Sequence, residues 1–191
     1  MIDKMWYEVG MRGMSFFFNG STVCKLDDKN RFVIPQSLRY GLVEEGKLEF
    51  FIGLGLGGCL SIYKKSDIEK MVEAFKKKQH VAKYQKFFTL FFSTLHQTSC
   101  DKIGRVNLPQ LLKNAAKIKK EVVVAGVMDK VEIWPKEVYE ANLDQAFSSS
   151  GDDLKKLTDE AFSLLSETEE EKKEEEKNIL DSLLNSVKEP K

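Results

Sequence analysis

Hydrophobic and polar positions along this chain are spaced as in strands in some segments and as in helices in others. Short clusters of turn-forming residues separate these segments. Residues 16–26, FFFNGSTVCKL, are rich in aromatic and β-branched residues, which is typical of a strand. The next cluster, DDKN, predicts a turn because Asp and Asn tolerate positive φ, and RFVI predicts a second strand. Pro35 then predicts the first turn of a short helix, which Gly41 can end.

A β-hairpin is predicted after this helix. The stretches LEFFI, residues 48–52, and CLSIY, residues 59–63, are typical of strands. The loop between them carries Gly53, Gly55 and Gly58 in the GxGxxG spacing of dinucleotide-binding turns. That chemistry requires a helix directly after the glycines to receive the pyrophosphate, whereas the residues here are strand-like. We therefore expect a hairpin loop.

Two amphipathic helices follow, over residues 64–79 and 81–92. In the first, Ile68, Met71, Val72 and Phe75 recur at i, i+3, i+4 and i+7 on one face. In the second, four aromatic residues have the same spacing, which favours core packing over a cofactor site: Tyr84, Phe87, Phe88 and Phe91.

The whole pattern then occurs a second time. The pairs Asp27 and Asp101, Arg31 and Arg105, and Pro35 and Pro109 are each separated by 74 positions. The second unit is expected as a strand at 94–100, the turn DKIG, the strand RVNL, a helix at 109–117, the strands EVVVAG and VEIW, and a helix opened by Pro135. A unit of this kind used twice predicts internal symmetry.

Composition allows an ordinary buried core, since 42% of the 191 residues are hydrophobic and 10% are aromatic. Residues 16–144 hold 21 Lys and Arg against 15 Asp and Glu, whereas residues 145–191 hold 7 against 13. A basic body with an acidic tail is one composition expected of a polyanion-binding protein, and it also fits mere solubility. In the tail we expect a linker at SSSGDD and two amphipathic helices around ETEEEKKEEEK.

Several chemistries have no support in the pattern. Cys24, Cys59 and Cys100 are far apart, and His80 and His96 are isolated, so we expect buried free thiols, no metal and no cofactor. We expect no catalytic residue and no small-molecule substrate, because HExxH, GxSxG and GxxxxGK[ST] are absent. No apolar run suits a membrane helix and the first residues do not resemble a signal peptide, so we expect a cytoplasmic protein.

The repeated turn has two interpretations. In each copy an Asp lies four residues before an Arg, which favours a hairpin corner closed by a surface ion pair. The same loop also carries cations in both copies, Lys29 with Arg31 and Lys102 with Arg105. Lysine can bind phosphate and arginine can contact a guanine edge through two hydrogen bonds, so the loops are candidates for DNA binding.

These residues resemble the MraZ family of bacterial transcriptional regulators. The resemblance covers residues 18–147 and rests on FNGSTVCKLDDKNRFVIPQSLR, DKIGRVNLPQLL and EVVVAGVMDKVEIW. It implies an α+β fold of two AbrB-type swapped-hairpin β-barrel repeats related by a pseudo-two-fold axis, followed here by a C-terminal helical tail. It further implies a ring-shaped homo-oligomer on the nucleoid. Such regulators bind promoter direct repeats in double-stranded DNA and usually repress the division and cell-wall gene cluster, including their own gene.

Site residues carry over position by position. Lys29 and Arg31 match the cationic pair of the first loop, and Arg105 matches the arginine of the second. Gly104 keeps the family glycine, whereas Asn30 replaces it in the first loop. Asp27 and Asp101 shape the turns. Ile103 occupies the position in the second loop that Lys29 has in the first, which leaves Lys102 as the second phosphate-binding lysine. The family's opening aromatic-Arg-Gly occurs as Phe18-Asn19-Gly20.

The expected organisation has five parts: an extension at 1–15, a first repeat at 16–80, a connecting helix at 81–92, a second repeat at 93–147, and an acidic helical or disordered tail at 148–191. An alternative function remains open at this point. AbrB-type antitoxins pair with toxins through a terminal segment, and the tail could serve this chain in that way.

Overall fold

A computed structural model describes residues 16–148 and 155–163 of the chain. The described residues up to Tyr139 form one compact unit, and the described residues from Glu140 onward form a second. The elements in chain order are β1 (Ser21–Lys25), β2 (Arg31–Val33), α2 (Gln36–Gly41), β3 (Glu49–Leu54), the 3-10 turn η1 (Leu56–Gly58), β4 (Leu60–Lys64), α3 (Lys65–Lys76), α4 (Ala82–Thr94), β5 (His96–Ser99), β6 (Arg105–Asn107), α5 (Gln110–Ala115), β7 (Glu121–Val127), β8 (Lys130–Pro135) and α6 (Lys136–Ser148).

The predicted repetition is present in the structure. Strands β2 and β6 are offset by 74 residues, and so are helices α2 and α5. The hairpin of β3 and β4 corresponds to that of β7 and β8, and α3 corresponds to α6. Helix α4 follows α3 in the first repeat, and a helical segment at residues 155–163 likewise follows α6 in the second. The two repeats are therefore the same α+β unit, and α4 joins them.

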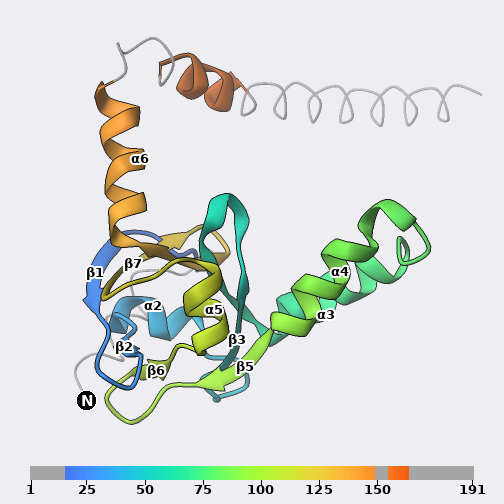
Figure 1. Ribbon diagram of the computed structural model, residues 1–191, viewed down its shortest axis with the longest axis horizontal. Coiled ribbons are helices and arrows are strands. Elements are labelled where there is room, and N and C mark those ends of the chain that lie inside the picture. Colours follow the sequence, from blue (N-terminus) through green and yellow to red (C-terminus); the bar gives the residue numbers. More distant parts are fainter. Residues whose placement is uncertain (1–15, 149–154, 164–191) are drawn as a thin grey trace, which may run out of the picture. The chain divides into compact units, whose positions relative to one another are not determined.

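The strands of the two repeats are interleaved. The large sheet has the order β1-β7-β8-β4-β3-β5 and is antiparallel throughout. The first strand of each repeat, β1 or β5, pairs with the hairpin of the opposite repeat, and β2 pairs with β6 in a separate two-stranded ribbon (Figure 1). This exchange confirms the swapped-hairpin fold and makes each repeat depend on the other.

A single hydrophobic core lies between the ribbon and the sheet. Phe32 of β2 and Val106 of β6 point into it and are 1% and 0% exposed. Side chains of both repeats fill the rest: Ile34, Leu38, Leu42, Phe50, Ile52, Leu60, Ile62, Leu108, Leu112, Val122, Val124, Val131 and Ile133. At roughly 1.5–3 kcal/mol for each large apolar side chain, this burial is the main stabilising contribution.

The structure corrects three expectations about helix ends. Pro35 and Pro109 occupy the N-cap positions with ψ of 140° and 137°, and Pro135 is the last residue of β8. The prolines thus precede their helices by one residue. Gly41 ends α2 as expected, although it has no positive φ. Its small size matters instead, because a Cβ there would lie 2.0 Å from Cε1 of Phe16.

The glycine-rich loop joins β3 to β4 as a hairpin, as expected. Leu54 pairs with Leu60, and Gly57 and Gly58 adopt positive φ of 68° and 91°. The residues after the loop form β4 rather than a helix, so the helix N-terminus that a dinucleotide requires is missing at this place.

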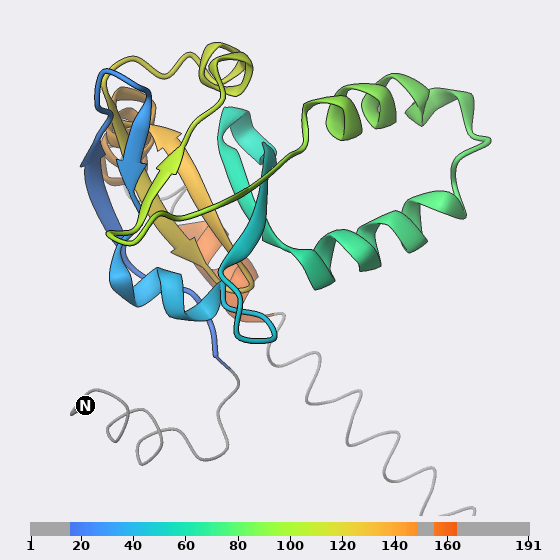
Figure 2. The ribbon, with the colours of Figure 1, turned by 90° about the horizontal axis from the view of Figure 1, so that it is seen from below.

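Helices α3 and α4 form a hairpin that extends away from the sheet (Figure 2). Phe75 of α3 lies 5.3 Å from Phe88 and 6.2 Å from Phe91 of α4, measured between ring centroids. The expectation of core packing holds for Phe91, which is 2% exposed, and is wrong for Tyr84 and Phe87, which are 40% and 47% exposed. The reason is that α3 covers only one side of α4.

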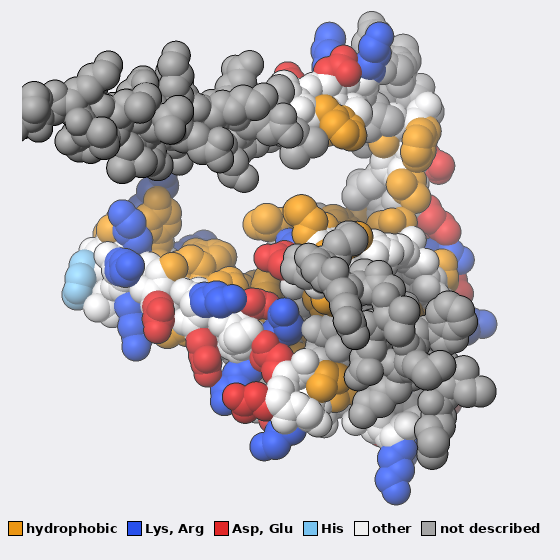
Figure 3. All heavy atoms as spheres, turned by 180° about the vertical axis from the view of Figure 1, so that it is seen from behind, with side chains coloured by type: hydrophobic (Ala, Val, Ile, Leu, Met, Phe, Trp, Pro, Cys, Tyr) orange, Lys and Arg blue, Asp and Glu red, His pale blue; other side chains and the backbone are white. Residues whose placement is uncertain are grey.

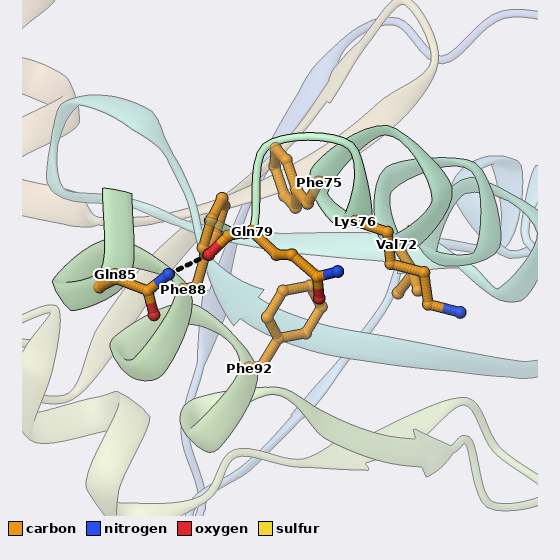
Figure 4. A pocket seen from close by; sticks show the side chains of 7 residues that line it. All are labelled: Val72, Phe75, Lys76, Gln79, Gln85, Phe88 and Phe92. Atoms are coloured by element: carbon orange, nitrogen blue, oxygen red, sulfur yellow. Dashed lines mark hydrogen bonds between the residues drawn. The ribbon is translucent and has the colours of Figure 1, made fainter. Parts of the chain in front are cut away.

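This hairpin carries apolar, basic and acidic side chains on the face seen in Figure 3. Its inner side has a groove of about 410 Å³ with aromatic walls from both helices, and Gln85 Nε2 donates a hydrogen bond to the Gln79 carbonyl at one end (Figure 4). Among the described residues, no helix combines the length and apolar composition needed to cross a membrane.

The second unit contains the end of α6 and a helical segment at residues 155–163. Phe147, Leu157 and Phe162 are 77%, 63% and 66% exposed in it. The predicted linker, the charged run and the last amphipathic segment lie mostly outside the described residues.

Candidate nucleic-acid interface

The ribbon of β2 and β6 has one buried and one outward face. Arg31 pairs with Asn107, Phe32 with Val106, and Val33 with Arg105. Because side chains alternate along a strand and directly paired residues share a face, Phe32 and Val106 lie inward. Arg31 and Arg105 consequently share the outward face.

The two arginines are close neighbours on this face. They occupy diagonal positions of the antiparallel pair, which places their Cβ atoms about 7 Å apart. Their side chains are 31% and 36% exposed, and Val33 and Asn107 beside them are exposed. Two guanidinium groups from residues 74 positions apart thus lie on one narrow surface.

The first turn, residues 27–30, is organised around the carboxylate of Asp27. Oδ1 accepts hydrogen bonds from the backbone N–H groups of Lys29 and Arg31, both at 2.9 Å. Oδ2 accepts from Nε of Arg31 at 2.8 Å and lies 2.7 Å from Nη2. The Asp27 N–H donates to the Arg31 carbonyl at 2.8 Å, which closes the turn.

The second turn, residues 101–104, has the same hydrogen bonds. Asp101 Oδ1 accepts from the N–H groups of Ile103 at 3.1 Å and Arg105 at 2.9 Å. Its Oδ2 accepts from Nε of Arg105 at 2.7 Å. The Asp101 N–H donates to the Arg105 carbonyl at 2.9 Å. The aspartates therefore fold each turn and also hold the arginine that follows it.

These contacts change the ionisation of the turns. The hydrogen bond from the Arg31 side chain, with those from the backbone, lowers the pKa of Asp27 to about 2. The Arg105 side chain and backbone lower the pKa of Asp101 in the same way. The pKa of Arg31 is raised, mainly by its hydrogen bond to Asp27, and Asp101 makes a smaller electrostatic contribution.

The remaining candidates occupy the turns themselves. Asn30 and Gly104 hold the equivalent left-handed positions, with φ of 56° and 86°. Lys29 and Lys102 are exposed, and Ile103, which stands where the first turn has Lys29, is 60% exposed. All four candidate cations thus belong to the ribbon or to a turn that leads into it.

Sequence reasoning missed three residues near the turns: Arg39, Gln110 and Lys113. Lys113 Nζ donates to Asn30 Oδ1 at 2.5 Å, and Asn30 Nδ2 donates to Gln110 Oε1 at 2.9 Å. Arg39 lies against Gly104. These side chains come from the short helices of the opposite repeat. The offset of 74 that relates Arg39 to Lys113 was the available signal.

The arrangement suits the major groove of DNA. A two-stranded ribbon fits that groove, and arginine can donate two parallel hydrogen bonds to guanine O6 and N7. Asp27 accepts a hydrogen bond from Nε of Arg31 and forms an ion pair with Nη2, which leaves the Nη1 donors for a ligand. The exposed lysines at the two turns carry the positive charge that phosphate contacts require.

Other chemistry has little support in the described part of the chain. No three His, Cys, Asp or Glu side chains lie close enough there to hold a metal ion. Cys24, Cys59 and Cys100 are free thiols, and burial raises the pKa of each. Cys59 is fully buried, whereas Cys24 and Cys100 are half-buried, so the expectation of buried thiols is met in full by Cys59 alone.

Comparison with protein families gives a match that covers both repeats. The family described as "MraZ protein, putative antitoxin-like" matches residues 17–89 and again residues 91–160. The two matched segments correspond to the two structural repeats, and the family consists of non-enzymatic regulators.

Proposed function

The chain belongs to the MraZ family, and we propose that it is a sequence-specific DNA-binding transcriptional regulator. In this proposal it binds direct repeats in promoter DNA and represses the division and cell-wall gene cluster, including its own gene, within the cytoplasm and on the nucleoid. The observation that carries the proposal is the outward face of the ribbon, on which Arg31 and Arg105 lie side by side.

The residues divide into three roles. Arg31 and Arg105 contact base edges in the major groove, because each is held in a fixed direction by its aspartate. Lys29 and Lys102 bind phosphates on either side of the ribbon. Asp27, Asp101, Asn30 and Gly104 set the shape of the turns and make no contact with bases.

Promoter binding by arginine variants tests this proposal. We expect Arg31→Ala with Arg105→Ala to abolish specific binding to the repeats upstream of the chain's own gene, while circular dichroism and oligomer size stay unchanged. Lys70→Ala is the matched control, because it removes a cation with a 76% exposed side chain on α3. Unchanged promoter affinity in the double arginine variant would contradict the proposal.

Self-association into a ring is the second part of the proposal. Large apolar residues on α4 support it, since Phe87 and Leu90 are 47% and 49% exposed on a helix that is hydrophobic on several sides. Identical ribbons on one ring would meet identical DNA boxes, and every contact after the first would be effectively intramolecular. Modest single contacts could then produce high affinity.

A second candidate function is favoured by the family description, which includes the words antitoxin-like. In that case the segment after Phe147 would bind a partner protein. A stoichiometric partner that co-purifies with the full chain and is lost on truncation at Ser148 would support it. A pure homo-oligomer that shifts promoter DNA would argue against it.

A further inference from the structure

Each DNA-reading turn is in contact with the helix of the opposite repeat. Lys113 of α5 donates from Nζ to Asn30 Oδ1 in the first turn at 2.5 Å. Arg39 of α2 lies against Gly104 in the second turn, so closely that a Cβ there would come 2.5 Å from Cζ and from Nη1. Arg39 and Lys113 are separated by 74 positions, as Asn30 and Gly104 are. The two contacts are therefore equivalent under the internal symmetry.

Backbone hydrogen bonds follow the same exchange. The Ile34 N–H donates to the Gly104 carbonyl at 3.0 Å, and the Leu108 N–H donates to the Asn30 carbonyl at 2.9 Å. Ile34 and Leu108 are again equivalent positions, each at the end of the ribbon strand beside the opposite turn. The left-handed residue of each turn thus accepts from a backbone N–H of the other repeat. It also contacts a helix cation of that repeat, through a hydrogen bond at Asn30 and through close packing at Gly104.

The two turns use different residue pairs for this contact. In the second turn, glycine leaves the space that the Arg39 guanidinium occupies, and Nε of Arg39 is buried without a hydrogen-bond partner in the described structure. In the first turn, the Asn30 side chain fills that space, accepts from Lys113 and donates to Gln110 at 2.9 Å. A larger turn residue is accompanied by a lysine, and glycine by an arginine.

We propose that Arg39 and Lys113 are positioning residues that hold the DNA-reading turn of the opposite repeat, and that turn residue and helix cation form matched, exchangeable pairs: Gly104 with Arg39, and Asn30 with Lys113. The proposal rests on the proposed function for its DNA-binding consequence. It makes the two turns mechanically dependent on each other's repeat, so neither turn is a separate reading element.

Converting the pair of Gly104 and Arg39 into a pair of asparagine and lysine tests whether the turn residue and the helix cation are matched. Gly104→Asn introduces a side chain into the position of the Arg39 guanidinium, while Asn still tolerates the positive φ of 86°. We expect amide hydrogen exchange at Ile34 to become about tenfold faster in this variant. Adding Arg39→Lys recreates the Asn30 and Lys113 arrangement, with Gln36 in the place of Gln110, and should restore the exchange rate to within about threefold of the original.

Two controls make the result specific. Exchange at Leu108, which reports on the first turn, should stay unchanged in Gly104→Asn and should respond instead to Asn30→Gly, with rescue by Lys113→Arg. Promoter affinity is measured in parallel by fluorescence anisotropy, and should fall about tenfold in Gly104→Asn and recover in the double variant.

Amide hydrogen exchange is measured without DNA. It therefore tests whether turn residue and helix cation are matched even if the chain does not bind promoter DNA. Faster exchange at Ile34 that Arg39→Lys reverses supports the proposal. Unaltered exchange in Gly104→Asn, or equal exchange with and without Arg39→Lys, overturns it. A failure of the chain to bind promoter DNA with intact exchange behaviour would overturn the proposed function alone.

Discussion

Removing the turn lysines and removing the ribbon arginines should weaken DNA binding in two different ways. The first variant carries Lys29→Ala and Lys102→Ala, and the second carries Arg31→Ala and Arg105→Ala. The lysine side chains are exposed at the turns, where the proposed function expects phosphates to flank the ribbon. The arginines lie on the ribbon face, held by Asp27 and Asp101. Loss of the lysines should therefore weaken binding to every DNA sequence, whereas loss of the arginines should weaken binding to the specific promoter sequence.

The expected magnitudes follow from this geometry. Each phosphate contact contributes about 0.9 to the slope of log affinity against log salt, so the lysine variant should flatten the slope by about 1.8 per protomer. Between 50 and 200 mM salt, each phosphate contact makes the DNA affinity fall by an additional factor of roughly 3.5. Each arginine keeps donors free for a bidentate guanine contact, whose loss costs roughly fivefold to 150-fold in specific affinity.

Fluorescence anisotropy with promoter DNA and a shuffled duplex, each measured across a salt series, distinguishes the two effects. Lys70→Ala serves as the control for simple loss of positive charge. The assignment of roles is refuted by a lysine variant with an unchanged salt slope. It is also refuted by an arginine variant that loses as much affinity for the shuffled duplex as for the promoter.

Four further outcomes are expected. Because the folded pKa of Asp27 is about 2, its stabilising contribution is complete above the ordinary carboxyl range and is lost as pH falls from about 4 through 2, which a carboxyl NMR titration measures. Burial raises the pKa of Cys59 to about 11, so at pH 8 only about one thiol in a thousand is ionised and a thiol reagent should label it only on unfolding. Phe32→Ala should cost about 3–5 kcal/mol in chemical denaturation, since Phe32 is buried beneath the ribbon. Phe87→Lys with Leu90→Lys should reduce the oligomer size in sedimentation while Lys86→Ala leaves it unchanged, and an unchanged size would exclude this face as the contact.

The local part of the site could be predicted from the sequence because its interactions are local. An aspartate four residues before an arginine, with Asn30 or Gly104 between them, determines the turn through hydrogen bonds that span only a few residues. The strands and helices next to these turns followed from the same short-range signals. The helices after Pro35 and Pro135 begin one residue later than expected, because the helix start depends on backbone angles that composition does not specify.

The contacts between repeats could not be predicted in this way. Arg39 and Lys113 have the sequence context of ordinary surface cations on short helices, and only the strand exchange brings them to the opposite turn. The aromatic spacing of α4 shows which residues share a face, but it contains no information on whether another element covers that face. Tyr84 and Phe87 therefore remained exposed against expectation.

Joining both repeats in one chain removes a constraint that identical subunits would impose. In a symmetric pair of separate repeats, each substitution in one turn would also occur in the other. Here the equivalent positions differ, with Lys29 opposite Ile103 and Asn30 opposite Gly104. One end of the ribbon thus presents Lys29, and the other presents the exposed apolar side chain of Ile103, which is suited to a thymine methyl group. The proposed reading face consequently has a direction along the DNA, which suits boxes that are repeated in the same orientation rather than as palindromes.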